Sequence, residues 1–308
     1  MSAGTLVSII TPSLNRVSMI AESVQSVQVQ DYSPIEHIVV DGGSTDGTLA
    51  ILAGYPSIRV VSGTDLGVYQ ALNKGLQTAQ GELIGFLNTD DFYSEGIFTE
   101  VVDLFQKTHA DAIAGQAVLF QRRGDGTNSV FRRTRYLGPQ VFWKELTYGD
   151  PAFNAWFFHR RVFDQIGAFD TSYQLVSDHD LLLRFALSNL THMPLERVAY
   201  WYRSHPDSLT FSRNLQGFSP LADENLRLVD QYLDRVPRDS RFELQRVRTR
   251  DTITAASRDF RAGAFARGLH YAQIGIRYDL LWPAKFFARL VTGIYRWIGR
   301  RLGFYPPI

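Results

Sequence analysis

Short apolar runs alternate with stretches of helical periodicity through the first 110 residues of the chain. The apolar runs occupy residues 6–10, 35–40, 58–61 and 83–87, and each is followed by a polar loop. Strands that alternate with helices are joined by right-handed crossovers, which bring the strands together in parallel. We therefore predict an α/β fold with a mostly parallel sheet flanked by helices. The polar loops should gather at the carboxyl edge of this sheet, where such folds bind ligands.

The fourth apolar run ends in two adjacent acids, Asp90 and Asp91. Adjacent carboxylates repel each other, and the end of a strand does not require them. A hard divalent cation, Mg²⁺ or Mn²⁺, would turn this repulsion into attraction, because one or two protein carboxylates and substrate phosphates commonly complete its coordination shell. The pair therefore predicts a metal–diphosphate site. The alternative is a polar turn that caps a helix opening at Ser94 and Glu95.

The charge balance and the cysteine count argue against several classes of protein. The 308 residues carry a net charge of +1, so no global attraction to nucleic acid or to a membrane is expected. The absence of cysteine excludes disulfides and thiolate metal sites. The N-terminus lacks the pattern of a signal peptide, and no apolar run reaches the roughly 18 residues that a spanning helix needs. We expect a cytoplasmic protein, either soluble or peripheral on the membrane.

The loop after the second apolar run, VDGGSTDGT, is rich in glycine and short polar residues. It is not the G-x-G-x-x-G dinucleotide fingerprint, and the chain has no G-x-x-x-x-G-K-[ST] phosphate loop. Its glycines allow the backbone to approach a ligand closely. Asp41 either contacts that ligand or satisfies loop amides, and Asp46 is expected to cap the following helix.

Four short motifs lie at the expected ends of three strands and in one predicted helix. They are TPSLN after the first apolar run, VDGGSTDGT after the second, GVYQALNKG in the third predicted helix and FLNTDD after the fourth run. In this order they resemble glycosyltransferase family 2, the inverting nucleotide-sugar transferases of GT-A fold. The resemblance covers about the first two thirds of the chain. It implies a Rossmann-like GT-A catalytic domain at residues 1–215 and a C-terminal helical region at residues 216–308.

The resemblance also implies roles for individual positions. The implied nucleotide-sugar-binding residues are Thr11, Pro12, Asp41, Asp65, Lys74 and Asp90, and the implied metal ligands are Asp90, Asp91 and His205. Two positions depart from the family pattern. Asn88 stands at the head of the D-x-D triplet, where the family has an acid, and Gln70 stands where many relatives have Asp.

A second acid pair precedes the helical run at residues 181–187. This segment also resembles glycosyltransferase family 2. In that family the first acid of the pair is the catalytic base, and Asp178 stands at its position in this chain. Ser177 and Asp180 also have the spacing of a capping box, which assigns Asp180 to structure and leaves Asp178 for chemistry. Glycosyl transfer needs a carboxylate within hydrogen-bond reach of the acceptor hydroxyl. We therefore predict Asp178 as the base.

From Pro220 onward the chain is predicted to be helical. The last predicted helix, residues 284–302, carries apolar residues on one face and Lys or Arg on the other, so it either lies in a membrane interface or packs its apolar stripe on the catalytic domain. A second basic stretch, residues 122–135, is either a solvated face or a contact for an anionic acceptor.

Together these features predict an inverting, metal-dependent glycosyltransferase. The donor would be a nucleoside-diphosphate sugar, with UDP favoured by family habit, and the acceptor a hydroxyl of a glycan or lipid-linked molecule in polysaccharide or lipopolysaccharide assembly. The expected partners include an inner-membrane surface and no nucleic acid. Two alternatives remain. A sugar-phosphate nucleotidyltransferase would carry a Gly- and Arg-rich loop after the first strand, unlike TPSLNR, and a non-catalytic carbohydrate-binding protein would not need the acids.

Overall fold

The computed structural model describes residues 4–64, 67–134, 143, 144, 146, 152–205 and 218–301, with the backbone alone at 218, 219 and 293–301. The chain divides into two compact units, Met1–Ser212 and Arg213–Ile308. In the first unit the elements are β1 (Val7–Ser13), α1 (Ile20–Gln28), β2 (Ile35–Asp41), α2 (Thr48–Leu52), β3 (Ile58–Ser62), α3 (Val68–Thr78), β4 (Leu83–Phe86), β5 (Phe92–Tyr93), α4 (Ile97–Thr108), β6 (Ala112–Arg122), β7 (Asn128–Arg133), η2 (Phe153–Ala155), β8 (Trp156–His159), α6 (Arg161–Ile166), α7 (Ser177–Leu187) and β9 (His192–Arg203).

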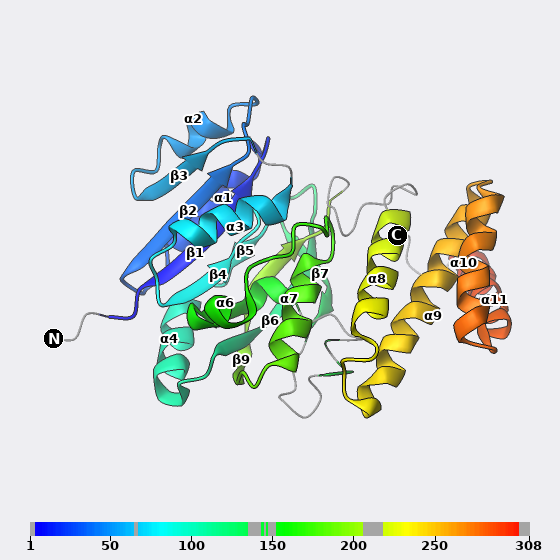
Figure 1. Ribbon diagram of the computed structural model, residues 1–308. Coiled ribbons are helices and arrows are strands. Elements are labelled where there is room, and N and C mark those ends of the chain that lie inside the picture. The colour runs from blue at the N-terminus through cyan, green and yellow to red at the C-terminus, as the bar shows by residue number, and fades with distance from the viewer. Residues whose placement is uncertain are drawn as a thin grey trace. The chain divides into compact units, whose positions relative to one another are not determined.

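The described strands of the first unit form one sheet in the order β3-β2-β1-β4-β8-β6-β9-β5, with β7 paired to β6 (Figure 1). Strands β1 to β4 are parallel, as the alternating pattern predicts. β8 runs antiparallel between β4 and β6, and β5 runs antiparallel to β9, so the sheet as a whole is mixed. The α/β fold class is confirmed, and the parallel half carries the predicted loops.

Close packing of helices on the parallel strands follows from small residues at the contacts. Gly75 on α3 is one such position, because a Cβ atom there would lie 2.3 Å from the Cγ2 atom of Ile10 on β1. On the other side of β4, the consecutive residues Trp156, Phe157 and Phe158 of β8 are fully buried. A strand buried on both faces shows no polar alternation, so the sequence pattern does not mark this strand.

The start of α4 differs from the predicted cap. The helix begins at Ile97 after Gly96, and no side chain at its N-cap position accepts a hydrogen bond. Instead the amide oxygen of Gln30, two residues after the end of α1, accepts hydrogen bonds from the backbone N–H groups of Ile97 and Phe98. The prediction that Ser94 and Glu95 open this helix is wrong, because β5 and its pairing with β9 occupy the preceding residues.

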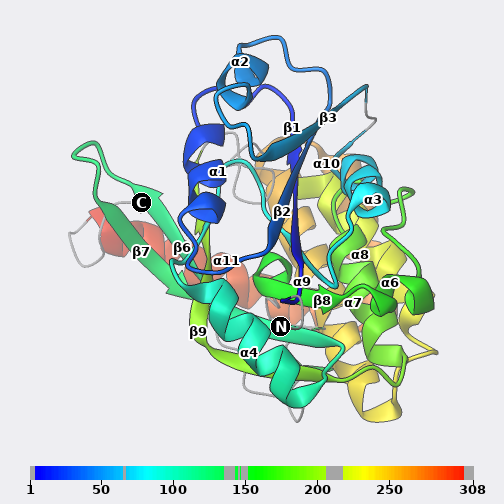
Figure 2. The ribbon, with the colours of Figure 1, turned by 90° about the vertical axis from the view of Figure 1, so that its left-hand side faces the viewer.

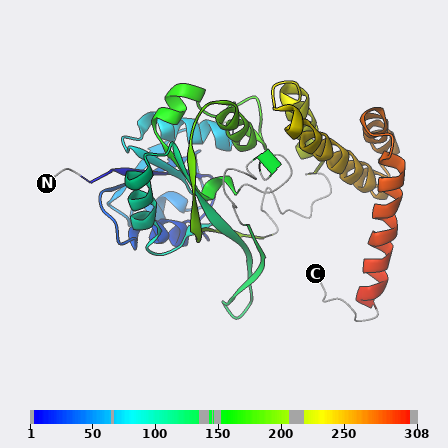
Figure 3. The ribbon, with the colours of Figure 1, turned by 90° about the horizontal axis from the view of Figure 1, so that it is seen from below.

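A two-stranded arm formed by β6 and β7 extends from the sheet (Figures 2 and 3). Residues 122–133 of the predicted basic excursion at 122–135 fall on this arm, and residue 135 lies outside the described residues. The side chains of β7 are mostly exposed, including Arg132 and Arg133. The turn at residues 124–126 joins the two strands, as its Gly-Asp-Gly sequence favours.

The second unit is helical. Its elements are α8 (Phe218–Tyr232), α9 (Arg238–Arg261), α10 (Phe265–Tyr278) and α11 (Trp282–Arg301). Its core gathers Leu226 from α8, Ile253 from α9, Tyr271 from α10 and Trp282 from α11. Gly275 permits this packing, because the Trp282 indole fills the space where a Cβ atom would lie. In the part of the chain that the structure describes, every helix is too short or too polar to span a bilayer.

The fold predicts how stability responds to acid. Burial lowers the pKa of His37 on β2 to about 3, and that of His192 on β9 to about 4. Unfolded histidine has a pKa of about 6.5, so between these values the unfolded chain binds protons that the folded chain does not. The free energy of unfolding should therefore fall as pH drops below about 6.5, by up to about 1.4 kcal/mol per pH unit for each histidine.

Denaturant unfolding at pH 7, 6 and 5 checks this expectation. His37→Gln keeps an amide that can bond to Thr11 and removes the proton site, so it should make the dependence on pH shallower. His192→Gln is the matched comparison and should remove about as much of the pH dependence, because the folded-state pKa values of both histidines lie below pH 5. An unchanged slope in His37→Gln would contradict the assignment.

Candidate functional site

The loops that follow β1 and β2 are joined by hydrogen bonds. The Asn15 backbone N–H donates to Ser44 Oγ at 2.8 Å, and the Thr45 N–H donates to Asn15 Oδ1 at 2.9 Å. Asp46 accepts from the Val17 N–H at 3.0 Å and also from the N–H and hydroxyl groups of Thr48. Asp46 is not the predicted cap residue of α2, because Gly47 occupies the N-cap position; it bonds to the first residue of the helix instead and fixes the TPSLN loop against the VDGGSTDGT loop.

Asp41 lies at the carboxyl end of β2, directly opposite Ser13 on β1 and Ser62 on β3. Its carboxylate is buried and accepts hydrogen bonds from the Gly43 and Ser44 N–H groups and from Ser44 Oγ, at 3.0, 2.8 and 2.6 Å. The Asp41 side chain therefore stabilises the conformation of the glycine loop by hydrogen bonds to its backbone. Its predicted contact with the nucleotide base stays a prediction.

The other predicted nucleotide residues are placed as follows. Thr11 is buried and its hydroxyl lies 2.9 Å from His37 Nε2, whereas Pro12 is half-buried. Lys74 on α3 donates from Nζ to the Thr64 carbonyl at 3.3 Å, and this bond brings the cation to the loop after β3. Asp65 lies outside the described residues.

Asp91 is held by three donors in the interior. The Tyr200 hydroxyl and the Asn88 amide donate to Oδ2 at 2.9 and 3.2 Å, and the Arg203 N–H donates to Oδ1 at 2.8 Å. Burial and then the charge of Asp90 raise the pKa of Asp91 well above its usual value, and the three donors oppose that shift. The carboxyl group of Asp91 therefore joins the end of β4 to β9.

Asn88 explains one departure from the family pattern. Its side-chain amide donates to Asp91, which a carboxylate at position 88 would repel instead. Its backbone N–H donates to the Tyr200 hydroxyl at 3.0 Å, and its carbonyl accepts from Ser23 Oγ at 3.1 Å. The amide at position 88 is thus suited to a loop whose neighbouring acid is buried.

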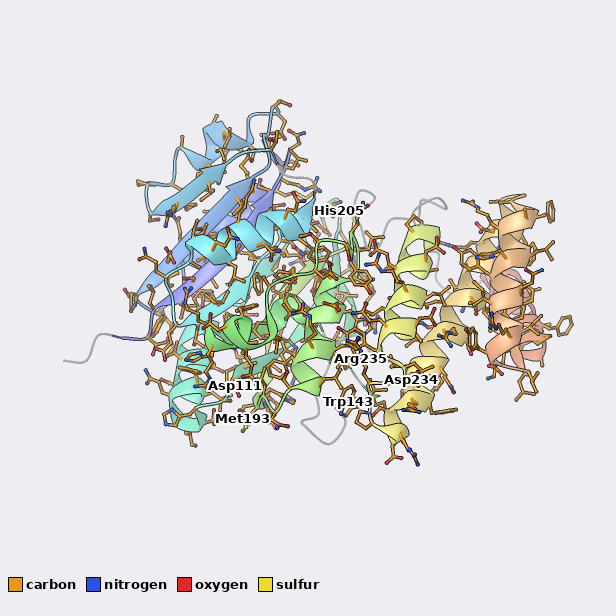
Figure 4. The ribbon with its side chains drawn as sticks, viewed as in Figure 1. Asp111, Trp143, Met193, His205, Asp234 and Arg235 are labelled. Atoms are coloured by element: carbon orange, nitrogen blue, oxygen red, sulfur yellow. The ribbon has the colours of Figure 1, made fainter. Side chains whose placement is uncertain are left out.

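Asp90 has a different environment from Asp91. Its Oδ2 atom lies 2.8 Å from Nε2 of His205, which follows the end of β9 (Figure 4). The two side chains are 18% and 10% exposed, and the Nδ1 atom of His205 is buried without a hydrogen-bond partner among the described residues. One carboxylate and one imidazole together suit a divalent cation that takes its other ligands from a diphosphate. Among the described residues, no three acidic or histidine side chains cluster as a metal site.

An ion pair network lies beside this loop. Glu22 on α1 accepts from the guanidinium of Arg203 and from that of Arg122 at the end of β6. Burial raises the pKa of Glu22, but the two arginines outweigh it and the pKa is lowered. Because the Arg203 backbone also binds Asp91, the network connects the acid loop to the base of the β6–β7 arm.

Asp178 lies in the first turn of α7. Its Oδ1 atom accepts from the Tyr69 hydroxyl at 3.0 Å and from the His179 N–H at 2.8 Å. The predicted capping box is wrong, because Val176 is the N-cap residue and Ser177 makes no capping bond. Asp180 is structural for another reason, since it forms an ion pair with Arg184, whose guanidinium also donates to the carbonyls of Gly167 and Ala168.

A chain of aromatic contacts connects Asp178 to the carboxyl end of β4. Tyr69 stacks on Phe169 with ring centroids 5.5 Å apart, and Phe169 meets Phe86, the last residue of β4, edge-on at 5.2 Å. Asn73 on α3 exchanges two hydrogen bonds with the Phe169 backbone, at 2.9 and 3.0 Å. The start of α7, the start of α3 and the end of β4 are therefore fixed to one another.

The contacts of several of these residues could not be predicted from the sequence alone. Tyr200 and Asp91 are 109 residues apart, as are Tyr69 and Asp178, so no local pattern reveals either contact. Tyr69 and Asn73 do fall within the GVYQALNKG motif, and a polar residue on the inward face of a helix is a usable signal. Glu22 and Arg203 carry no such signal.

Comparison with known proteins agrees with this geometry. The model of glycosyl transferase family 2 matches residues 8–167. The uncharacterized glycosyltransferase Rv1514c of Mycobacterium tuberculosis is 31% identical over 194 residues, which cover 61% of this chain and 71% of that protein. A PGL/p-HBAD biosynthesis glycosyltransferase of Mycobacterium bovis is 30% identical over 189 residues, which cover 59% and 70% of the two chains.

Two solved structures share the fold at low sequence identity. S. aureus TarS 1–349 in complex with UDP-GlcNAc has a TM-score of 0.55 at 16% identity, covering 88% of each chain. The mannosyltransferase PcManGT from Pyrobaculum calidifontis, in complex with GDP-Man and Mn²⁺, has a TM-score of 0.59 at 16% identity, covering 99% of this chain and 82% of the other. These likenesses confirm the GT-A fold.

The Asp91 cluster gives a stability prediction. Tyr200→Phe removes the hydroxyl shared by Asp91, Asn88 and Asn154, and should lower the free energy of unfolding by about 2–3 kcal/mol. The control is Tyr93→Phe, another buried tyrosine, which loses one bond to the Phe86 carbonyl and should cost about 1 kcal/mol. Guanidinium unfolding at pH 7 measures both. Equal losses would contradict a central role for Tyr200.

Proposed function

The chain belongs to glycosyl transferase family 2, and on that premise we propose that it transfers a hexose-type sugar from a nucleoside diphosphate to an acceptor hydroxyl with inversion. The observation that carries the proposal is the contact between Tyr69 and Asp178. Through Tyr69 and Phe169 a carboxylate of α7 is tied to the end of β4, where the acid loop begins. These contacts support a proposed base that lies near the proposed donor-binding loops.

The donor is proposed to lie across the loops after β1, β2 and β3. The hydrogen-bonded TPSLN and VDGGSTDGT loops supply a fixed backbone surface for the nucleoside, with Thr11, Pro12 and Asp41 along it. Lys74 supplies a cation for the phosphate side, next to the loop that contains Asp65. TarS is seen with UDP-GlcNAc and PcManGT with GDP-Man, so a nucleoside-diphosphate sugar suits this fold, and we favour UDP.

A divalent cation, Mg²⁺ or Mn²⁺, is proposed at Asp90 and His205. When bound, it would offset the negative charge that develops on the departing diphosphate. The pairing of His205 Nε2 with Asp90 Oδ2 and the unpartnered Nδ1 atom support these two residues as ligands. Asp91 is proposed to hold the loop in position, because its three hydrogen bonds already occupy it. PcManGT is seen with Mn²⁺, which supports the choice of ion.

Asp178 is proposed as the general base. Its carboxylate would take the proton of the acceptor hydroxyl while that oxygen attacks the anomeric carbon. The bond from the anomeric carbon to the diphosphate breaks as the new bond forms, and the electron pair leaves with the diphosphate. A single displacement inverts the anomeric configuration. The Tyr69 hydroxyl orients the carboxylate, and orientation of reacting groups accounts for several kcal/mol of a typical barrier.

The acceptor is proposed to be a glycan or a lipid-linked molecule. The arginines of the β6–β7 arm and the Glu22 network connect the acid loop to a basic surface that suits an anionic acceptor. One relative is named for PGL/p-HBAD biosynthesis, which agrees with assembly of a cell-envelope glycolipid or polysaccharide. A cytoplasmic enzyme at the membrane surface would meet a lipid-linked acceptor there.

Substitution of the base tests the proposal. Asp178→Asn should lower the rate of transfer by roughly 10²–10⁴-fold, because the amide accepts no proton, and should leave donor affinity nearly unchanged. The measurements are release of the nucleoside diphosphate with acceptor present and donor binding by thermal shift. Asp164→Asn, an exposed acid in the first turn of α6, is the control and should retain full activity. Loss of donor binding in Asp178→Asn would contradict its assignment as the base.

The products of the same assay separate the alternatives. A transferase yields a nucleoside diphosphate, a nucleotidyltransferase yields pyrophosphate, and a carbohydrate-binding protein yields neither. Pyrophosphate as the product would overturn the proposal.

A further inference from the structure

Positive charge is concentrated in one part of the helical unit. Residues 262–301, which include α10 and α11, contain seven Arg or Lys residues and a single acid, Asp279, although the whole chain has a net charge of +1. Asp279 is already bonded to Lys285 at 2.7 Å. The segment therefore presents strong positive charge on a chain that is otherwise acidic on balance.

The same helices expose large apolar side chains. On α10, Gly268, Tyr271 and Gly275 face the interior of the unit, and the exposed residues Phe265 and Leu269 lie one turn apart on another face. Ile276 continues that face two turns later and is exposed as well. An outward apolar stripe of this kind has no role in the core of the unit.

The turn into α11 and the first turns of that helix extend the apolar surface. Leu280 and Leu281 in the turn are 89% and 64% exposed, and Phe287 is 68% exposed. Trp282 and Phe286 face inward instead, stacked with ring centroids 4.9 Å apart. Helical geometry then turns Phe287 away from the core on one flank of α11 and sets Lys285 and Arg289, one turn apart, on the other flank. Both cations are exposed.

We propose that the exposed apolar residues of α10 and α11, here called the docking surface, insert into the interface of an anionic lipid bilayer. The docking surface consists of Phe265, Leu269, Ile276, Leu280, Leu281 and Phe287. Exposed apolar area of this kind mostly marks a contact with a partner or a membrane. The cations on the flanks of the same helices select a negatively charged partner, because their long side chains reach lipid phosphates while the apolar residues enter the acyl boundary.

Charge also decides between a bilayer and a second copy of the chain. Two copies meeting through the docking surface would bring two sets of Arg and Lys together with one acid on each side, and this arrangement is repulsive. A bilayer rich in anionic lipid removes that repulsion. The inference rests on the helical unit alone and holds whichever donor or base the catalytic unit uses.

The test is co-sedimentation of the full chain with vesicles of phosphatidylcholine, alone or with 30% phosphatidylglycerol. The wild-type protein should bind the anionic vesicles, lose this binding as salt screens the surface charge, and bind the neutral vesicles at least roughly tenfold more weakly. Phe287→Ser combined with Leu281→Ser should weaken anionic binding by roughly tenfold or more, because two inserted side chains are lost.

Phe242→Ser is the matched control. Phe242 on α9 is 64% exposed and lies outside the docking surface, so its replacement should leave binding unchanged. Thermal unfolding verifies that each variant is folded. Failure of the wild-type protein to bind anionic vesicles, or an equal loss in Phe242→Ser, would overturn the proposal. A dimer in light scattering that Phe287→Ser with Leu281→Ser dissociates would assign the surface to a second copy instead.

Discussion

The arrangement of the catalytic unit depends on a buried carboxyl group, that of Asp91. Burying such a group is costly unless donors surround it, and leaving a buried polar group without its partner typically costs about 1–3 kcal/mol. Here the donors come from β9 and from the acid loop itself, so satisfying Asp91 requires the end of β4 to lie against β9. The loop between them is thereby fixed before any ligand arrives. Asp90 and His205 are held together as a consequence of this geometry.

Neighbouring residues in the motifs divide into those that build the site and those proposed to do chemistry. In the acid loop Asp91 is bonded within the fold while Asp90 is partly exposed, and in α7 Asp180 pairs with Arg184 while Asp178 meets Tyr69. Each pair has the same chemistry in the sequence and different surroundings in the structure. In each pair, the acid whose partners all lie within the fold contributes position, and the other acid is the one that we propose to meet the substrate.

The sequence predicts the α/β class and the four parallel strands well, because period-2 and period-3.6 patterns are strong there. The sequence patterns do not predict β5, because it has only two residues. They do not predict β8 either, because a continuous apolar run can belong to a buried strand or to a buried helix. The capping box at Ser177 fails because the helix begins one residue earlier than the pattern implies. The contacts of Tyr200 and Tyr69 span more than a hundred residues, so they follow from tertiary packing and from no local rule.

The most direct test of this account locates a bound cation. Crystals grown with UDP and Mn²⁺ would give an anomalous difference peak for manganese. The account predicts that peak roughly 2–2.5 Å from the Asp90 carboxylate and the His205 imidazole, with Asp91 still bonded to Tyr200. A peak on Asp91, with the Tyr200 hydrogen bond broken, would contradict it.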